Sequence, residues 1–268
     1  SLLIVGFLSM IVWGHHMFVT GMNPWIGKYF SIATVIITAP FSVLAVNLLA
    51  SLWRAKLRPG VPMLYCVAAI STLGFGGLGG LFLGTQTSDI YFHETYFVVG
   101  HFHLMIGTVT FLSIFAAIYY WFPKMFGKML DPKLGRWHFW LTAIPMMLIF
   151  ILMHMQGLGG MVRRTFDTSV YDYNTTNALL LTPISLLAFL LFLGQIIFFC
   201  NLFRSLRRGE AAGPNPWRAT TLEWETPSPA PHGNFGATLP EVHRWPYEYS
   251  PEDHEGDDFL PQTTEKPA

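Results

Sequence analysis

Six long stretches of this 268-residue chain contain no Asp, Glu, Lys or Arg, and they constrain its fold more than any other feature. They are residues 1–27, 29–53, 59–88, 95–123, 137–162 and 173–203. Each is longer than the roughly 20 apolar residues that a helix needs to cross a bilayer. Because a helix satisfies its own backbone in lipid, the sequence predicts an all-α, multi-pass membrane protein. We expect six transmembrane helices, at about 1–20, 29–53, 62–84, 95–122, 137–160 and 178–203.

The charged residues, 12% of the chain, are distributed unevenly. The connections after the second, fourth and sixth stretches carry ten Lys and Arg, and the other three connections carry three. Since cytoplasmic loops are enriched in Lys and Arg, both the first residue and the region after the last helix are expected on the cytoplasmic side. The basic residues form no continuous stripe, so nucleic-acid binding is not expected.

The chain changes character at residue 209. The last 60 residues hold 10 of the 18 prolines and 11 of the 16 acidic residues. We therefore expect two regions: the six helices over 1–208, and a Pro-rich acidic cytoplasmic tail over 209–268 that lies extended on another surface or is partly disordered. The first stretch lacks a basic leader, a cleavage site and a starting Met, which predicts that the chain begins inside a larger or divided protein.

Histidines gather near the outer ends of the predicted helices. Imidazole is a common ligand for copper, iron and zinc, and ionisable side chains inside a membrane are costly and usually functional. This group therefore predicts a metal or cofactor site. With one carboxylate and two arginines, its members are His15, His16, His93, Glu94, His101, His103, Arg163 and Arg164.

The spacing of the histidines restricts how they can bind. At about 100° per residue, the side chains of His101 and His103 diverge by about 200° and point to opposite faces of a helix. They cannot share one metal, but each can hold its own cofactor, with Phe102 between them. The adjacent His15 and His16 diverge by about 100° and can meet on one metal only with a third ligand from another segment.

Other interpretations remain open from the residues alone. His154 and His138 are each expected to be ordinary hydrogen-bonded histidines, the second of them interfacial at the cytoplasmic end. The pair Arg163–Arg164 is equally typical of an interfacial anchor. A multi-span transporter or scaffold without haem is therefore the alternative class, and the presence of haem colour separates the two.

Five segments carry a family resemblance. Trp13–Met22 is similar to a copper-binding stretch, His93–His103 to a haem-ligand helix, and His154–Arg164 to a segment that holds haem propionates. Asn215–Trp217 and Thr221–Trp224 are similar to a bacterial tail. Together they resemble subunit I of the haem-copper oxygen reductases, the cytochrome c oxidase family. The resemblance covers nearly the whole chain and implies that its helices form the second half of a twelve-helix subunit.

The resemblance implies the catalytic residues. His15 and His16 would be two of the three ligands of copper B. His101 would be the axial ligand of the high-spin, oxygen-binding haem. His103 would be one axial ligand of a low-spin haem on the opposite face, and both haems are expected to be of type a.

It also implies roles for the polar residues nearer the outer surface. His93 and Glu94 would form a Mg or Mn site, with Glu94 standing where the family usually has Asp. Arg163 and Arg164 would pair with haem propionates, because guanidinium forks suit carboxylates. Asp89 would join the propionate region.

The implied activity is reduction of O₂ to water, coupled to proton translocation, with cytochrome c as the expected electron donor and quinol as the alternative. The implied partners are the N-terminal half of subunit I, subunit II with its dinuclear copper, subunit III and membrane lipid. The expected location is the bacterial inner membrane, with the metal sites towards the outer face. Phe41 and Leu44 stand where the family often has the Thr and Lys of a proton route, so we do not expect that route in its usual form.

Overall fold

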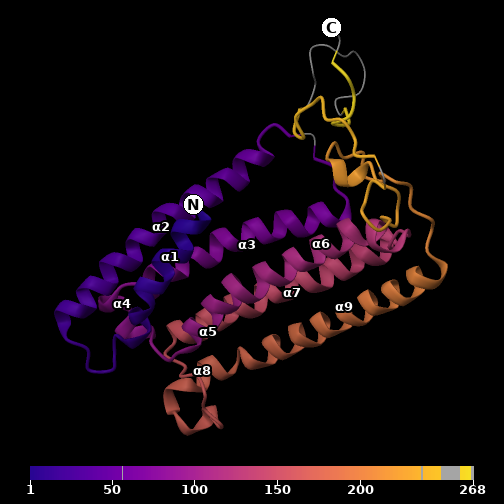
Figure 1. Cartoon of the computed structure of the whole chain (residues 1–268). Helices are drawn as coiled ribbons and strands as arrows, with labels where there is room; N and C mark the ends of the chain where they lie inside the picture. The colour runs from indigo at the N-terminus through magenta and orange to yellow at the C-terminus, as the bar shows by residue number, and fades with distance from the viewer. Residues whose placement is uncertain (56, 237, 249–259, 267–268) are drawn as a thin grey trace. The chain divides into compact units, whose positions relative to one another are not determined.

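The computed structural model describes residues 1–55, 57–236, 238–248 and 260–266, and the regular secondary structure of these residues is helical apart from two isolated bridges. Lys56, one of the basic residues counted above, and parts of the predicted tail lie outside these ranges. The helices are drawn in Figure 1. The long ones are α2 (Pro24–Leu52), α3 (Val61–Leu83), α6 (Val109–Phe126), α7 (Pro132–Leu158) and α9 (Leu181–Arg208).

Shorter helical segments connect the long ones. They are α1 (Leu2–Val12), α4 (Gln86–Phe92), α5 (Tyr96–Phe102) and α8 (Thr175–Ala178). Four are 3₁₀ turns, namely η1 (Trp13–Met17), η3 (Thr168–Val170), η4 (Asp172–Asn174) and η5 (Leu222–Trp224). A π-helical turn, η2 (His103–Thr108), joins α5 to α6, so the haem-ligand helix predicted from the sequence is continuous but not regular.

Five of the described helical segments are long and apolar enough to cross a membrane: 24–52, 61–83, 96–126, 132–158 and 181–208. They confirm the all-α membrane fold, whereas a count of six is not confirmed. The predicted first helix is shorter than expected, because α1 ends at Val12 and the chain tightens into η1. Gly14, a poor helix former, lies in this turn, where an added Cβ would overlap the ring of Phe30.

Local sequence signals explain where two of the helices begin. The side chain of Asn23 caps α2 by accepting a hydrogen bond from the backbone N–H of Trp25 at 2.9 Å, and Pro24 takes the first helical position. Thr95 caps α5 by accepting from the N–H of Phe97 at 3.2 Å. The Thr95 cap fixes where the helix that carries His101 starts, and the Asn23 cap fixes where α2 starts after the turn that carries His15 and His16.

The described chain divides into two units, Ser1–Ala116 with Trp137–Ile196 and Ala117–Arg136 with Ile197–Ala268. In the first unit the core joins η2, α7 and α9. Its buried members are Leu104, Met146, Ile149 and Phe150, with Met153, Ile184, Leu187 and Leu191 packed against them. The glycines of α3 allow η2 to pack closely against this helix. A Cβ at Gly76 would lie 2.9 Å from Met105 and 3.1 Å from Leu104.

His138 belongs to this unit and corrects an expectation. It was expected at the membrane interface, but it is fully buried, and its Nδ1 is 2.8 Å from the hydroxyl of Tyr65, which is also fully buried. The imidazole therefore lies within the helix packing, where Tyr65 supplies a hydrogen-bond partner for Nδ1.

The second unit contains the first part of the tail, packed on the chain's own helix end. Lys124 of α6 donates from Nζ to the carbonyls of Thr226 and Pro214 at 2.7 and 3.0 Å, and its ammonium lies 5.0 Å from the centroid of the Trp224 ring. The indole N–H of Trp217 donates to another carbonyl of α6 at 2.8 Å. These described tail residues are held on α6, where the sequence alone predicted an extended or partly disordered segment.

Candidate functional site

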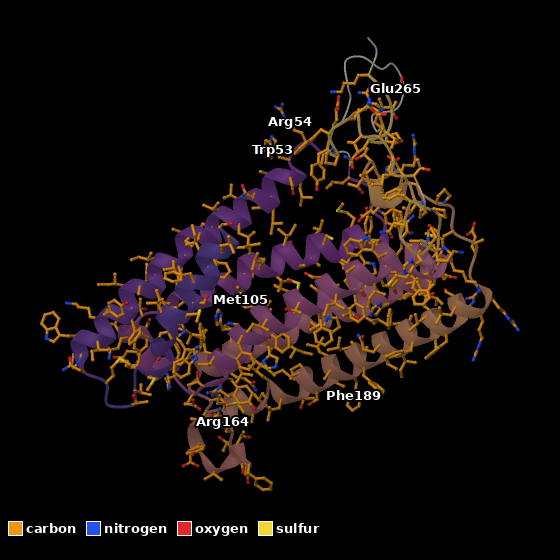
Figure 2. All side chains as sticks on the ribbon, in the orientation of Figure 1. Trp53, Arg54, Met105, Arg164, Phe189 and Glu265 are labelled. Carbon is orange, nitrogen blue, oxygen red and sulfur yellow. The ribbon has the colours of Figure 1, made fainter. Side chains whose placement is uncertain are left out.

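A cavity of about 790 Å³ in the first unit brings together most of the residues singled out from the sequence. Such volumes are typical of ligand and cofactor sites, which run from roughly 300 to 1,000 Å³. Met105, which lines this cavity, lies among the helices in Figure 2. Seven of the nine predicted site residues line it: His15, His16, Asp89, His93, Glu94, His101 and Arg163.

The turn η1 presents His15 and His16 to this cavity with their ring centroids 4.3 Å apart. His15 Nδ1 lies 3.0 Å from the hydroxyl of Thr34, and that hydroxyl donates its only proton to the carbonyl of Phe30 at 2.6 Å. The hydroxyl must therefore accept from His15, which places the imidazole proton on Nδ1. The lone pair of His15 Nε2 is left for a ligand.

His101 is oriented in a similar way by α3. Its Nδ1 lies 2.9 Å from the carbonyl of Gly76, and because a carbonyl can only accept, Nδ1 carries the proton. The glycines of α3 make this approach possible, since a Cβ at Gly79 would lie 2.9 Å from the same nitrogen. The Nε2 of His101 is then free to bind a metal, and the carbonyl is the outer-shell group that fixes its orientation.

His103 has different surroundings, although it is only two residues away. Its Nδ1 donates to the carbonyl of Val99 at 2.9 Å, and its ring stacks on Phe150 of α7 with centroids 4.8 Å apart. His101 lines the cavity against α3, whereas His103 packs towards α7. Two separate positions, one for each histidine, agree with the divergence expected from their spacing.

His154 also lies close to the site. Its Nδ1 donates to the carbonyl of Phe150 at 2.7 Å, as expected of an ordinary histidine, but its ring lies beside the helix that carries His101. A Cβ at Gly79 would lie 3.3 Å from His154 Nε2. This close approach depends on the small residues of α3.

The charged residues cluster where α4 and the segment after α7 meet. His93 Nδ1 lies 2.7 Å from Asp89 Oδ2, and Asp89 is buried. Burial is the larger influence and raises the pKa of Asp89, although the hydrogen bond from His93 opposes it. Arg163 donates to both oxygens of Glu94 at 2.8 and 2.5 Å, and this pairing holds the pKa of Glu94 below its usual range.

Arg164 is mostly exposed, and its Nη1 lies 3.7 Å from Glu94 Oε2. It is labelled in Figure 2 beside the connection that leads to α8. The backbone ties the same segments together, because Thr95 and Val162 form an isolated antiparallel bridge. The sequence placed Glu94 with His93, but the strongest contact of the carboxylate is with an arginine about 70 residues further along the chain.

Whether a metal or cofactor fits the cavity depends on the ligand atoms that the cavity side chains offer. For copper and haem iron the fit is good, because two of the cavity imidazoles have Nδ1 held by an acceptor and Nε2 free. In the described residues no three His, Cys, Asp or Glu side chains converge as a complete metal site. For Mg or Mn the fit is poor, since both oxygens of Glu94 face a guanidinium.

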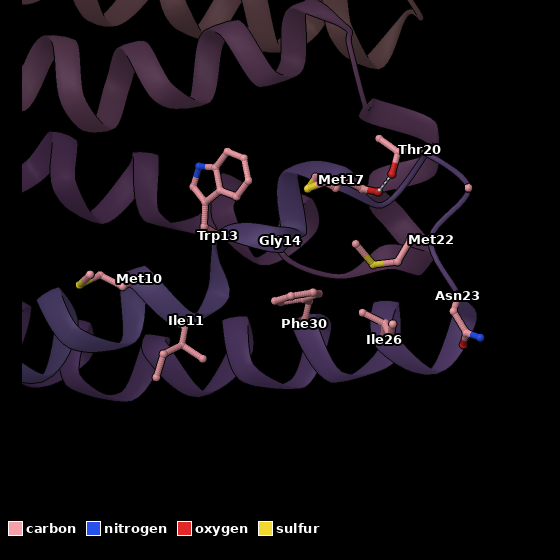
Figure 3. Close-up of a pocket in the computed structure, with 11 residues that line it drawn as sticks. Met10, Ile11, Trp13, Gly14, Met17, Thr20, Met22, Asn23, Ile26 and Phe30 are labelled. Carbon is pink, nitrogen blue, oxygen red and sulfur yellow. Dashed lines mark hydrogen bonds between the residues drawn. The ribbon is translucent and has the colours of Figure 1, made fainter.

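A second hollow lies beside η1 and has a volume of about 560 Å³. Figure 3 shows Trp13, Met17, Met22 and Phe30 around it, with the hydroxyl of Thr20 bonded to the carbonyl of Met17. Its lining contains no ionisable side chain. We therefore assign the chemistry to the larger cavity.

Comparisons with known proteins place this arrangement in a family context. A model of the family described as "Cytochrome C and Quinol oxidase polypeptide I" matches residues 1–197. The alternative cytochrome c oxidase subunit 1 of Bradyrhizobium diazoefficiens is 42% identical over 270 residues, covering 100% of this chain and 46% of that protein. Cytochrome c oxidase subunit 1 of Thermostichus vulcanus is 40% identical over 242 residues, covering 90% of this chain and 43% of that protein.

A solved structure of a haem-copper terminal oxidase dimer has a similar fold. The TM-score is 0.66 at 20% identity, and the match covers 76% of this chain and 41% of the other. At that identity the likeness concerns the fold alone. The chain spans less than half the length of the two curated relatives.

Proposed function

This chain belongs to the cytochrome c and quinol oxidase polypeptide I family, and we propose that it forms the C-terminal part of the catalytic subunit of a terminal oxidase that reduces O₂ to water. The observation that carries the proposal is the large cavity. There His15 and His101, from separate helical segments, both present Nε2 while Nδ1 is held in place.

In this proposal His15 and His16 hold copper, and the remaining ligand comes from the N-terminal half of the subunit. The adjacent rings contact each other with centroids 4.3 Å apart, so both are near the same point of the cavity wall. The hydroxyl of Thr34 keeps His15 in the tautomer that a metal requires.

His101 and His103 hold the two haem irons, of type a, from opposite sides of the same helical segment. The support is their separation into two environments, one against α3 and one against Phe150. When bound, the haems and copper supply the oxygen-binding and electron-transfer chemistry, while the protein supplies ligation, orientation and electrostatics.

The arginines are proposed to receive the acidic groups of the haems. Arg163 lines the cavity and uses only its Nε and Nη2 on Glu94. A guanidinium has five N–H donors in a fixed fork, so the Nη1 edge of Arg163 stays available for a propionate. Asp89 lies at the same end and holds His93.

The surrounding assembly is proposed by analogy with the relatives. They are named cytochrome c oxidase subunits, which favours cytochrome c over quinol as the donor. We propose as partners the N-terminal half of the subunit, subunit II with dinuclear copper, subunit III and lipid. The proposed location is a bacterial inner membrane, with the cavity towards the outer face and the tail in the cytoplasm.

Proton uptake accompanies O₂ reduction in this proposal, but the usual residues of one route are missing. Phe41 lines the cavity where the family often has Thr. The part of α2 that lines the cavity nevertheless carries the hydroxyls of Thr34, Thr38 and Ser42. Consecutive members of this set are four residues apart, so the three hydroxyls lie on one face of the helix. These hydroxyls are the polar groups of α2 through which protons would reach the cavity.

The deciding experiment is the reduced-minus-oxidised spectrum of the purified complex, with and without carbon monoxide. Two haem populations, of which only one shifts with carbon monoxide, support the proposal. A spectrum without haem bands would overturn it and leave a non-haem membrane protein.

A variant sharpens this test. His101→Ala should abolish carbon monoxide binding and turnover while the low-spin haem bands persist, because His103 has its own anchor. His232→Ala, at an exposed tail position, is the matched control and should change neither. Carbon monoxide binding that survives His101→Ala would refute the ligand assignment.

A further inference from the structure

Glu94 is hydrogen-bonded to Arg163 through both its side chain and its backbone. Arg163 Nε donates to Glu94 Oε2 at 2.8 Å and Nη2 to Oε1 at 2.5 Å. The N–H of Arg163 donates to the carbonyl of Glu94 at 2.9 Å, and the N–H of Tyr96 donates to the carbonyl of Met161 at 2.9 Å. Two charge-assisted bonds on one fork define the plane of the guanidinium as well as its position.

This pairing conflicts with a role for Glu94 as a metal ligand. Mg²⁺ and Mn²⁺ prefer oxygen ligands, among which the carboxylate is the one that supplies negative charge. Both oxygens of Glu94 already accept from Arg163, and Arg164 Nη1 lies 3.7 Å from one of them. A divalent cation on this carboxylate would lie beside two guanidinium groups, and like charges at such distances repel.

The neighbouring groups offer no substitute in the described residues. His93 Nδ1 is bound to Asp89 Oδ2 at 2.7 Å, which leaves one nitrogen of that ring. Within the part of the chain that the structure describes, no third His, Cys, Asp or Glu completes a metal-binding group there. The extra methylene of Glu, compared with the Asp usual in the family, is what gives the carboxylate its reach to the fork of Arg163.

We propose that Glu94 is a positioning residue for Arg163 and not a ligand of a divalent cation. It occupies the Nε–Nη2 edge of the guanidinium and leaves Nη1 outside this pairing, in a residue that lines the cavity. It also places a negative charge beside Arg163, so that the arginine contributes less net positive charge to the cavity. This inference rests on the proposed function, because the cavity is taken to hold haem.

The experiment compares the complete oxidase with its Glu94→Gln variant, both from cells grown with Mn²⁺. The first readout is the Mn²⁺ electron paramagnetic resonance signal per complex. We expect Glu94→Gln to leave it unchanged, including the case in which neither protein carries Mn²⁺. Loss in Glu94→Gln of a signal that the parent shows would overturn the proposal.

The second readout is the midpoint potential of the haem nearest Arg163. Removing a negative charge favours the reduced state, so Glu94→Gln should shift the potential upwards. The shift should shrink when Glu94→Gln is made in an Arg163→Gln background, because the two residues act as a pair. An equal shift in both backgrounds would contradict the positioning role. Asp167→Asn, an exposed acid bonded to Ser169 in the connection after α7, is the control and should show no shift.

Assembly failure also has a defined meaning. If Glu94→Gln alone fails to assemble, the double variant Glu94→Gln/Arg163→Gln should recover, since the unpaired charge is gone. Failure of both variants to assemble would refute the proposal that Glu94 acts by pairing with Arg163. A haem-free parent complex would instead refute the proposed function, so the two failures are distinguishable.

Discussion

Replacing Gly79 by Ala should displace the ring of His101. A Cβ built at Gly79 lies 2.9 Å from His101 Nδ1 and 3.3 Å from His154 Nε2, against an ordinary contact of 3.4–4 Å. Overpacking of this kind costs about 1–3 kcal/mol. The ring can relieve it only by leaving the carbonyl of Gly76, with which it makes a 2.9 Å bond worth about 0.5–1.5 kcal/mol. The ligating orientation should therefore become about 5- to 150-fold less populated.

The same helix provides the control for this variant. A Cβ at Gly77 meets nothing within 4 Å, so Gly77→Ala adds the same methyl group without the overlap. Both replacements gain the helix preference of Ala over Gly, about 1 kcal/mol, and their difference isolates the effect on the ring. The assay is the fraction of carbon-monoxide-reactive haem per complex, followed on heating. If Gly79→Ala retains this haem as well as Gly77→Ala does, the packing argument is refuted.

Three further variants test other contacts. Thr34→Val removes the acceptor of His15 Nδ1 and should weaken copper binding about 10- to 100-fold, measured by chelator titration; unchanged retention would contradict the tautomer argument. Lys124→Met removes an ammonium that donates to tail carbonyls at 2.7 and 3.0 Å, so limited proteolysis of the tail should be faster, and an unchanged cleavage rate would be inconsistent with a tail held there. Phe41→Thr with Leu44→Lys should leave the rate of active-site reduction nearly unchanged, whereas a large acceleration would show that the missing route was limiting.

The helical membrane fold could be predicted because its signal is compositional. An apolar helix of 23 to 31 residues with few charged side chains is typical of a membrane-embedded segment, and five such helices are present in the described part of the chain. The ends of the helices were less predictable. The first stretch contains no charge that would mark its end, yet the helix stops at Val12 and tightens around Gly14, which approaches Phe30 of another helix. Tertiary contact decided that boundary.

In the candidate site, too, some contacts could be predicted from the sequence and others could not. The opposite directions of His101 and His103 follow from helical spacing and agree with their surroundings. The pairing of Glu94 with Arg163 has no local signal, because the partners are 69 residues apart and meet only when α5 and α7 are packed. The tail is a similar case, since it is held by Lys124 through backbone carbonyls, which every sequence offers.

The anchors of the two haem-ligand candidates differ in kind, and this has a consequence for how they respond to mutation. His103 donates to the carbonyl of Val99, four residues earlier on its own helix, so its orientation is set by local backbone geometry. His101 donates to Gly76 on α3, so its orientation depends on the packing of two helices. Changes on α3 should therefore disturb His101, the proposed ligand of the oxygen-binding haem, while leaving His103 in place. The selective loss of one haem population, rather than of both, is the signature that this difference in anchoring requires.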